Sequence, residues 1–246
     1  MTGTAIGIDI GGSGIKGAPV DLATGTLAGE RKRLVTPSPA TPKAVAATVA
    51  QLLEELNVEG AVGITLPAVV MHGVARTAAN IDKDWIGTDA GELLAKATGR
   101  AVSVVNDADA AGIAEVKFGA GKDRSGVVLM LTLGTGIGSA LFVNGELVPN
   151  TELGHLHLHH GDAEEYAADS AREREDLSWE QYAHRLDQYL KLVHGLFWPD
   201  LIIIGGGISK KSEKYLPLID VDVEVVPAKL LNEAGIIGAA MQAPVV

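Results

Sequence analysis

Asn106 and Asp107 form an adjacent amide and carboxylate pair between an apolar segment, residues 102–105, and an expected helix over residues 108–118. An aspartate carboxylate can act as a general base that accepts a hydroxyl proton. An asparagine amide can both donate to and accept from neighbouring hydroxyls. The same pair could cap the helix, and on these two residues alone capping is the better interpretation. A catalytic role therefore depends on what the rest of the chain supplies.

Two glycine-rich turns could bind phosphate groups, because the backbone N–H groups of glycine-rich turns can converge on an anion. The residues of these turns and their neighbours are Gly11, Gly12, Ser13, Gly14 and Lys16, and Thr132, Gly134, Thr135 and Gly136. Residues 12–17 also satisfy G-x-G-x-x-G, but a dinucleotide-binding turn must open a helix. Gly17, Pro19 and an alternating pattern predict a strand there instead. The first turn is expected to close a β-hairpin.

Asp9 lies at the end of an apolar strand, just before the first turn. Burial of a carboxylate there costs free energy unless the carboxylate pairs with a cation or accepts hydrogen bonds. Mg²⁺ commonly takes one or two carboxylates together with phosphate oxygens, so Asp9 is a candidate magnesium ligand that also faces bound phosphates. Capping of its own turn is the alternative. A third glycine cluster contains Gly206 and Gly207 and precedes Lys210; it could bind phosphates at the start of a helix.

Strand and helix patterns alternate along the chain, which predicts the α/β class. Apolar or β-branched runs predict strands at residues 5–10, 15–20, 33–36, 62–66, 102–105, 127–133, 139–143 and 201–204. Helical spacing predicts helices that start at Thr41–Pro42 and near Asp89, the second ending at Gly99, and others at residues 178–193 and 233–241.

The two halves of the chain resemble each other. Asp9-Ile10-Gly11 aligns without gaps on Thr132-Leu133-Gly134, and Val20-Asp21 on Val143-Asn144. Such self-similarity predicts an internal duplication, although glycine-rich turns also converge by chance.

Composition narrows the class of protein. The 246 residues carry a net charge of −11, which argues against a nucleic-acid partner. No apolar run is long enough to span a membrane, and the N-terminus lacks the pattern of an export signal. The absence of cysteine excludes thiolate metal sites and suits the cytoplasm, the expected location. Cationic clusters occur at Lys117, Lys122 and Arg124 and at Lys210, Lys211 and Lys214, and either could be solvated surface.

Five segments, IGIDIGGSGIKGAPVD, VNDADAAGIAE, LTLGTGIGSALFVNG, TELGH and LIIIGGGIS, resemble the motifs of ROK-family sugar kinases in order and spacing. The resemblance implies a duplicated actin-like/hexokinase (ribonuclease H-like) fold of two lobes with an interlobe cleft. It implies a small lobe over residues 1–107, completed by the C-terminal helix 233–246, and a larger lobe over residues 108–232.

The resemblance also implies residue roles. Asp107 would be the catalytic base, and the other sugar-binding candidates are Asn80, Asn106, Glu152, His155 and Glu164. Glu165 directly follows Glu164, so either of these two glutamates could be the sugar-binding one. The donor-binding candidates are the turn residues named above, with Asp9 as the Mg²⁺ ligand. Most ROK proteins have a cysteine-rich zinc motif after the E-x-G-H sequence, and its absence makes a zinc site unexpected. His155, His157, His159 and His160 are expected to alternate along a strand-like stretch, with His160 on the opposite face from the others.

The segment HGLFWPDLIIIGGGISKKSEKY is most similar to actinobacterial polyphosphate glucokinases. This implies an enzyme that phosphorylates glucose or mannose with inorganic polyphosphate, ATP or both. A homodimer is expected because it is the commonest state of soluble enzymes. A strictly ATP-dependent hexokinase or N-acylhexosamine kinase is the alternative enzyme. A sugar-sensing regulator of the same family is the non-enzyme alternative, but few residues precede the first strand, whereas such regulators carry an N-terminal DNA-binding domain.

Overall fold

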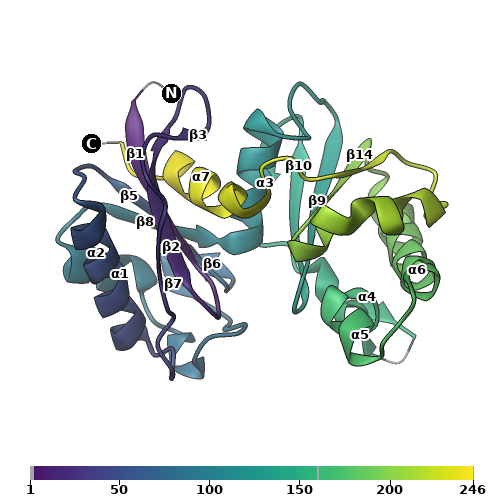
Figure 1. Cartoon of the computed structure of the whole chain (residues 1–246), viewed down its shortest axis with the longest axis horizontal. Coiled ribbons are helices and arrows are strands. Elements are labelled where there is room, and N and C mark those ends of the chain that lie inside the picture. Colours follow the sequence, from purple (N-terminus) through teal and green to yellow (C-terminus); the bar gives the residue numbers. More distant parts are fainter. Residues whose placement is uncertain (1–2, 160, 246) are drawn as a thin grey trace. The chain divides into compact units, whose positions relative to one another are not determined.

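A computed structural model describes residues 3–159 and 161–245 of the chain. The chain divides into two compact units (Figure 1). Unit 1 comprises Met1–Ala114 and Glu233–Val246, and unit 2 comprises Glu115–Asn232. Each unit has its own sheet and its own apolar core. No helix in the described ranges combines the length and apolar character that a membrane crossing requires.

Unit 1 is built on a six-stranded sheet of order β3-β2-β1-β5-β8, with β4 also paired to β2. The strands are β1 (Thr4–Ile10), β2 (Ile15–Asp21), β3 (Thr26–Leu27), β4 (Lys32–Leu34), β5 (Val62–Leu66) and β8 (Val102–Asn106). β1 and β2 form the predicted antiparallel hairpin, whereas β1, β5 and β8 are parallel. A short hairpin, β6 (Val70–Met71) and β7 (Val74–Ala75), and a 3₁₀ turn, η1 (Lys83–Trp85), follow β5.

Helices cover both faces of this sheet (Figure 1). They are α1 (Pro42–Leu56), α2 (Ala90–Thr98) and α7 (Ala234–Met241). α3 (Asp107–Phe118) follows β8, contacts α7 at Gly238, and has its first eight residues in unit 1 and the rest in unit 2. Thr41 caps α1 with Pro42 as its first residue, and Gly99 ends α2 in the left-handed region, as predicted. α7 packs on β1 and β5 at Gly7 and Gly63, where an added Cβ would collide with the helix backbone.

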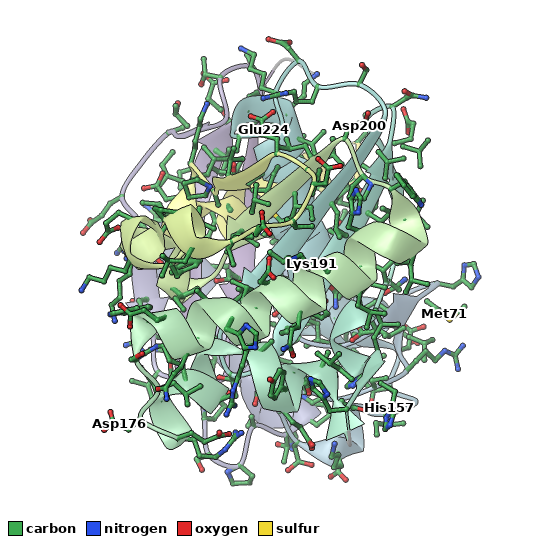
Figure 2. The ribbon with its side chains drawn as sticks, turned by 90° about the vertical axis from the view of Figure 1, so that its right-hand side faces the viewer. Met71, His157, Asp176, Lys191, Asp200 and Glu224 are labelled. Atoms are coloured by element: carbon green, nitrogen blue, oxygen red, sulfur yellow. The ribbon has the colours of Figure 1, made fainter. Side chains whose placement is uncertain are left out.

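Unit 2 has a five-stranded sheet of order β11-β10-β9-β14-β15. Its strands are β9 (Val127–Leu133), β10 (Ile137–Val143), β11 (Glu146–Val148), β14 (Leu201–Gly205) and β15 (Val225–Pro227). The remaining elements are η2 (Leu153–His155), β12 (His157–Leu158), β13 (Gly161–Asp162), α4 (Ala163–Ala167), α5 (Asp169–Arg174), α6 (Trp179–Phe197), η3 (Gly207–Lys214), η4 (Leu216–Leu218) and η5 (Leu231–Glu233). α6 packs its apolar side on the sheet and leaves Lys191 on its outer side (Figure 2).

The two sheets share one topology, an antiparallel hairpin followed by two parallel strands. The ungapped alignment of the two halves is nevertheless wrong in the second strand. Ile10 pairs with Ile15, but Leu133 pairs with Ile137, so the second turn is shorter. Asp21 therefore corresponds to Val143 and not to Asn144.

Two local predictions are also wrong. The segment after Gly206 is a 3₁₀ helix, η3, interrupted at Lys211, and the Ser209 hydroxyl bonds to the Gly206 carbonyl in competition with a regular helix. The histidine segment is not one continuous strand: His157 lies in the two-residue β12, but His155 lies in a 3₁₀ turn and His159 has a left-handed backbone. The expected alternation of faces is lost. His160 lies outside the described residues.

Candidate active site

The first hairpin places three polar side chains at one level of the unit 1 sheet. Asp9 pairs in register with Lys16 on β2 and with Thr65 on β5. The Lys16 ammonium lies 3.5 Å from one Asp9 oxygen, and the Thr65 hydroxyl donates to the other at 2.9 Å. Thr65 also accepts from the Ile10 N–H at 3.1 Å. The carboxylate is thus compensated, and Thr65 is a partner that the sequence did not single out.

The turn over residues 11–14 is held by side chains from the following segment. The Arg33 guanidinium donates to the Ser13 carbonyl at 2.7 Å, and the Thr36 hydroxyl donates to the Gly11 carbonyl. A Cβ at Gly14 would lie 2.5 Å from the Arg33 guanidinium, so any other residue there would displace that side chain. A Cβ at Gly12 would lie 3.3 Å from the Asn80 carbonyl oxygen, which brings Asn80 to this turn. Gly11 and Gly14 close the turn with a backbone hydrogen bond.

Asn106 caps α3. Its side-chain oxygen accepts from the N–H groups of Ala108 and Asp109 at 2.8 and 3.0 Å, and its amide donates to the Ala68 carbonyl at 3.1 Å. Asp107 is the first residue of α3 and is partly exposed, with one oxygen 2.9 Å from the Ala108 N–H. The capping interpretation of Asn106 is correct. This role leaves the assignment of Asp107 as a base intact, because the two side chains are distinct.

The second hairpin turn is bound to a carboxylate from outside the hairpin. A Glu164 oxygen from α4 accepts from the Ile137 N–H at 3.0 Å and fills the space that a Cβ at Gly136 would need. Ser170 binds the carbonyls of Gly134 and Thr135 from the other side. Glu165 instead lies against Gly161. Glu164, and not its neighbour, is therefore the glutamate at the phosphate-loop candidate.

The third glycine cluster lies beside the second. Thr132 pairs with Gly205 across β9 and β14, and Gly206, with φ of +81°, lies so close to the Leu133 backbone that a side chain would collide with it. Gly207 begins η3, on which Lys210 is exposed. The structure thus brings the two donor-loop candidates of unit 2 together.

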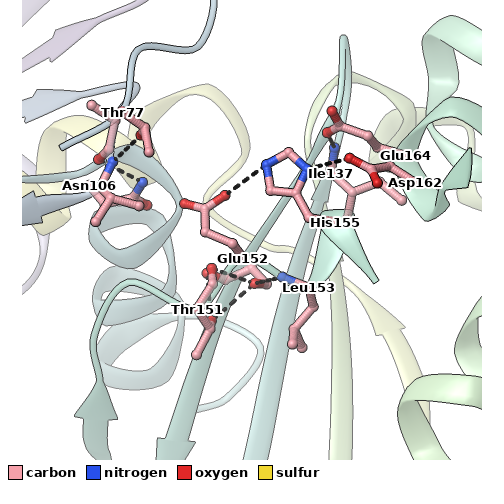
Figure 3. A network of polar contacts seen from close by, with 12 residues as sticks. Thr77, Asn106, Ile137, Thr151, Glu152, Leu153, His155, Asp162 and Glu164 are labelled. Carbon is pink, nitrogen blue, oxygen red and sulfur yellow. Dashed lines mark hydrogen bonds and ion pairs between the residues drawn. The ribbon is translucent and has the colours of Figure 1, made fainter. Parts of the chain in front are cut away.

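Glu152 and His155 face each other on unit 2 (Figure 3). His155 Nε2 lies 3.7 Å from a Glu152 oxygen, and Nδ1 lies 2.8 Å from an oxygen of Asp162. Buried Ser139 on β10 holds the backbone on both sides of Glu152, at Thr151 and Leu153. Gly154 lets the segment approach the Ile137 carbonyl. The sequence did not indicate Ser139, which is distant in the chain from the E-x-G-H motif. It did not indicate Asp162 either, because Asp162 belongs to no motif.

Charges around this pair alter both titrations. Burial raises the pKa of Glu152, an effect that the charge of His155 opposes and that of Glu164 reinforces. The hydrogen bond to Asp162 raises the pKa of His155, burial opposes it, and the charges of Glu164, Glu152 and Asp162 add to it. Glu164 is therefore near enough to act on both residues, as the expected sugar-binding group requires.

Lysines 211 and 214 gather at an aromatic side chain. Their ammonium groups lie 5.8 and 5.4 Å from the centre of the Trp179 ring, and the Arg172 guanidinium lies 4.7 Å from it. The Trp179 ring stacks on Tyr215. Interactions of this kind hold cations near the surface while they remain exposed.

Residues 5–167 match the model of the ROK family. A polyphosphate glucokinase of Mycobacterium tuberculosis is 53% identical over 96% of this chain and 89% of that protein. The crystal structure of an inorganic polyphosphate/ATP-glucomannokinase from an Arthrobacter species matches with a TM-score of 0.94 and 52% identity over 98% of each chain.

A ROK-family glucokinase from Streptomyces griseus, in complex with glucose and AMPPNP, matches with a TM-score of 0.81 and 27% identity over 98% of this chain and 99% of that one. These matches confirm the predicted α/β sugar-kinase fold. The agreement of family model, sequence and structure shows that the chain belongs to the ROK family.

Proposed function

We propose that this protein is a kinase that phosphorylates glucose at its 6-hydroxyl, with inorganic polyphosphate, ATP or both as phosphate donor. The observation that carries the proposal is its 53% identity, over nearly its whole length, to a polyphosphate glucokinase. The structural match to a polyphosphate/ATP-glucomannokinase supports the same chemistry and makes mannose a second sugar to test.

In this proposal, Asp107 takes the proton of the sugar 6-hydroxyl as the hydroxyl oxygen attacks the terminal phosphoryl group, and ADP or a polyphosphate shortened by one unit leaves. The side chain begins α3, where the partial positive charge of a helix N-terminus stabilises a carboxylate. Phosphoryl transfer demands alignment and charge compensation more than covalent participation by the protein. A single well-placed base is therefore sufficient on the acceptor side.

The donor phosphates are assigned to the turns at residues 11–14 and 134–136, to Gly206 and Gly207, and to Lys16 and Lys210. Asp9 fits a magnesium ion that arrives with the phosphates, because its carboxylate is partly exposed beside the turn and its nearest cation is 3.5 Å away. Bound magnesium would neutralise charge on the transferred group. Among the described residues no cluster of three or more acidic or histidine side chains could hold a metal. Magnesium at Asp9 would take phosphate oxygens and water as its other ligands.

The sugar is assigned to Glu152, His155 and Glu164, together with Asn80 and Asn106. Neutral polyols bind through polar groups that leave few hydroxyls unpaired. Asn106 has its side-chain oxygen on α3 and one amide N–H on the Ala68 carbonyl, so only the second amide N–H remains for a hydroxyl. One oxygen of Glu164 accepts from the Ile137 N–H, so a sugar bound to Glu164 would lie next to the second phosphate turn, at residues 134–136.

Three broader predictions accompany this function: lobes over residues 1–107 with 233–246 and over 108–232, a homodimer, and a cytoplasmic location. The direct test is an assay of purified protein with glucose or mannose, Mg²⁺ and either ATP or polyphosphate, with sugar phosphate measured chromatographically. We expect glucose 6-phosphate from polyphosphate. Product from ATP alone would leave an ATP-dependent hexokinase, and no product from either donor with retained sugar binding would favour a sugar-sensing protein.

A further inference from the structure

Asp162 points its carboxylate at His155 and not at the helix that it precedes (Figure 3). It occupies the N-cap position of α4, where aspartate usually binds backbone N–H groups, but its side chain makes no capping hydrogen bond. Its backbone pairs with His157 between β12 and β13. The β12–β13 pairing and the start of α4 thus fix the backbone of Asp162, whereas its side chain is hydrogen-bonded to His155.

The contact determines where the imidazole proton lies. An ionised carboxylate can only accept a hydrogen bond, so the Nδ1 atom, 2.8 Å from Asp162, carries hydrogen. In the neutral ring the Nε2 atom then has a lone pair, and in the cation it has a proton. Nε2 is also the atom that faces Glu152, at 3.7 Å.

We propose that Asp162 is a positioning residue for sugar recognition: it holds His155 in the Nδ1–H form and directs Nε2 to the sugar hydroxyls beside Glu152. This inference rests on the proposed function for the identity of the ligand. The tautomer and ring orientation are properties of the protein without sugar. They can therefore be tested even if the sugar assignment is wrong.

The surrounding charges make the arrangement responsive to pH. Three carboxylates bear on His155, from Asp162, Glu152 and Glu164, and Asp162 has the largest effect in raising its pKa. Protonation converts Nε2 from an acceptor into a donor, so sugar affinity should change across the titration of His155. Removal of the Asp162 charge should move that change to lower pH, whichever form of His155 binds sugar better.

The test compares Asp162→Asn, which can still accept from Nδ1, with Asp162→Ala, which cannot. Two-bond ¹H–¹⁵N correlation spectra of the full chain, titrated without sugar, report the protonation of each ring nitrogen. In the wild type we expect the Nδ1–H form. In Asp162→Asn, His155 should titrate at lower pH than in the wild type, and Asp162→Ala should show a mixture of the two tautomers. Asp220→Asn is the matched control, because Asp220 is exposed and its nearest cation is Lys191 at 3.7 Å.

Kinetics supply the second readout. We expect Asp162→Ala to raise the glucose KM about three- to tenfold, since a partly exposed hydrogen bond is lost, with kcat and donor KM nearly unchanged. Asp162→Asn should show a smaller rise in glucose KM and a downward shift of the pH at which His155 titrates in the kcat/KM profile. In a His155→Ala background the Asp162 change should add nothing, because its effect passes through the imidazole.

An unprotonated Nδ1 in the wild type would overturn the proposal, as would an Asp162→Ala effect of equal size in the His155→Ala background. If the spectra behave as expected but glucose neither binds nor reacts, the proposed function fails while the positioning of His155 stands. Loss of folding in Asp162→Ala, seen by circular dichroism, would leave Asp162→Asn and its spectra as the decisive variant.

Discussion

The two hairpins of this protein share one framework and differ in the side chains at matching positions. At the level of Asp9, unit 1 has Lys16 and Thr65 on the adjacent strands. At the corresponding level of unit 2, Thr132 is flanked by Gly138 and Gly205. One hairpin thus carries a compensated charge within its own sheet, whereas the other receives its carboxylate from Glu164 on α4.

The two sheets of the duplicated fold therefore have the same backbone topology, whereas the side chains at matching positions differ and can have different roles. In our proposal, unit 1 supplies the base and the magnesium ligand, and unit 2 supplies Glu152, His155 and Glu164 for the sugar, while both units contribute donor-binding turns. Changes at Asp107 should then lower kcat, and changes at Glu152 or His155 should raise the glucose KM. Each prediction below tests this division or a structural difference between the two sheets.

The largest effect is expected from Asp107→Asn, which keeps the size of the side chain but removes its basicity. General-base catalysis contributes about 10²- to 10⁴-fold, so kcat should fall at least about a hundredfold with glucose KM little changed. Steady-state kinetics and calorimetric glucose binding measure the two quantities. A variant with more than about a tenth of wild-type kcat would contradict the assignment of the base.

Glu152→Gln and His155→Ala should do the opposite and weaken glucose binding while kcat falls less. Loss of a charged hydrogen-bond partner typically costs about 1.5–3 kcal/mol, or roughly ten- to a hundredfold in affinity. Calorimetry gives the affinity directly. Unchanged glucose affinity in both variants would show that the Glu152–His155 segment is structural and would break the division between the units.

Gly7→Ala tests a structural difference, because α7 lies on Gly7 and Gly63 in unit 1 whereas Met130 and Ile203 occupy the matching places in unit 2. The added methyl group collides with the Ile236 carbonyl, so the free energy of unfolding should fall by about 1–3 kcal/mol. Thermal and urea denaturation measure this change.

Gly195→Ala provides the control for that substitution. Gly195 lies within α6, and a Cβ there meets nothing within 4 Å. The substitution should therefore stabilise the protein by about 0.5–1 kcal/mol through helix propensity. If both variants changed stability equally, the close approach of α7 would not explain the glycine at position 7.

The smallest effect is expected from replacing Lys210, Lys211 and Lys214 together by Gln. With a net charge of −11, a polyanionic donor needs a local cationic surface, which these exposed lysines supply. The polyphosphate KM should rise about two- to fivefold and lose part of its salt dependence, because surface charges are screened over about 8 Å. Glucose KM should stay unchanged. Equal losses with ATP and polyphosphate would indicate damage to η3 instead.

Local sequence signals predicted the framework well. Thr41–Pro42 and Gly99 marked helix ends, and the two glycine turns marked hairpins, because each signal depends on residues adjacent in the chain. The family motifs indicated Glu152 and His155, which the structure brings together. Both kinds of inference rest on short-range information.

Partners from distant segments could not be predicted in this way. Thr65 reaches Asp9 only because β5 pairs with β1, and Ser139 reaches the segment around Glu152 only through the course of β10. Asp162 was not among the candidate residues, and its contact with His155 depends on the turn of the chain between them. The histidine stretch failed for a local reason, since the left-handed backbone of His159 breaks the alternation that a strand requires.

The placement of α7 also has a consequence for synthesis. Unit 1 needs residues from both ends of the chain, and α7 covers β1 and β5 at Gly7 and Gly63. A ribosome makes those strands early and the covering helix last, so one face of the first sheet must wait while the whole of unit 2 is translated. Unit 2 is continuous and can fold as soon as it has left the exit tunnel. The nascent chain is therefore expected to complete its second unit before its first. A stop codon just before Ala234 would release a protein whose N-terminal sheet lacks α7 on β1 and β5.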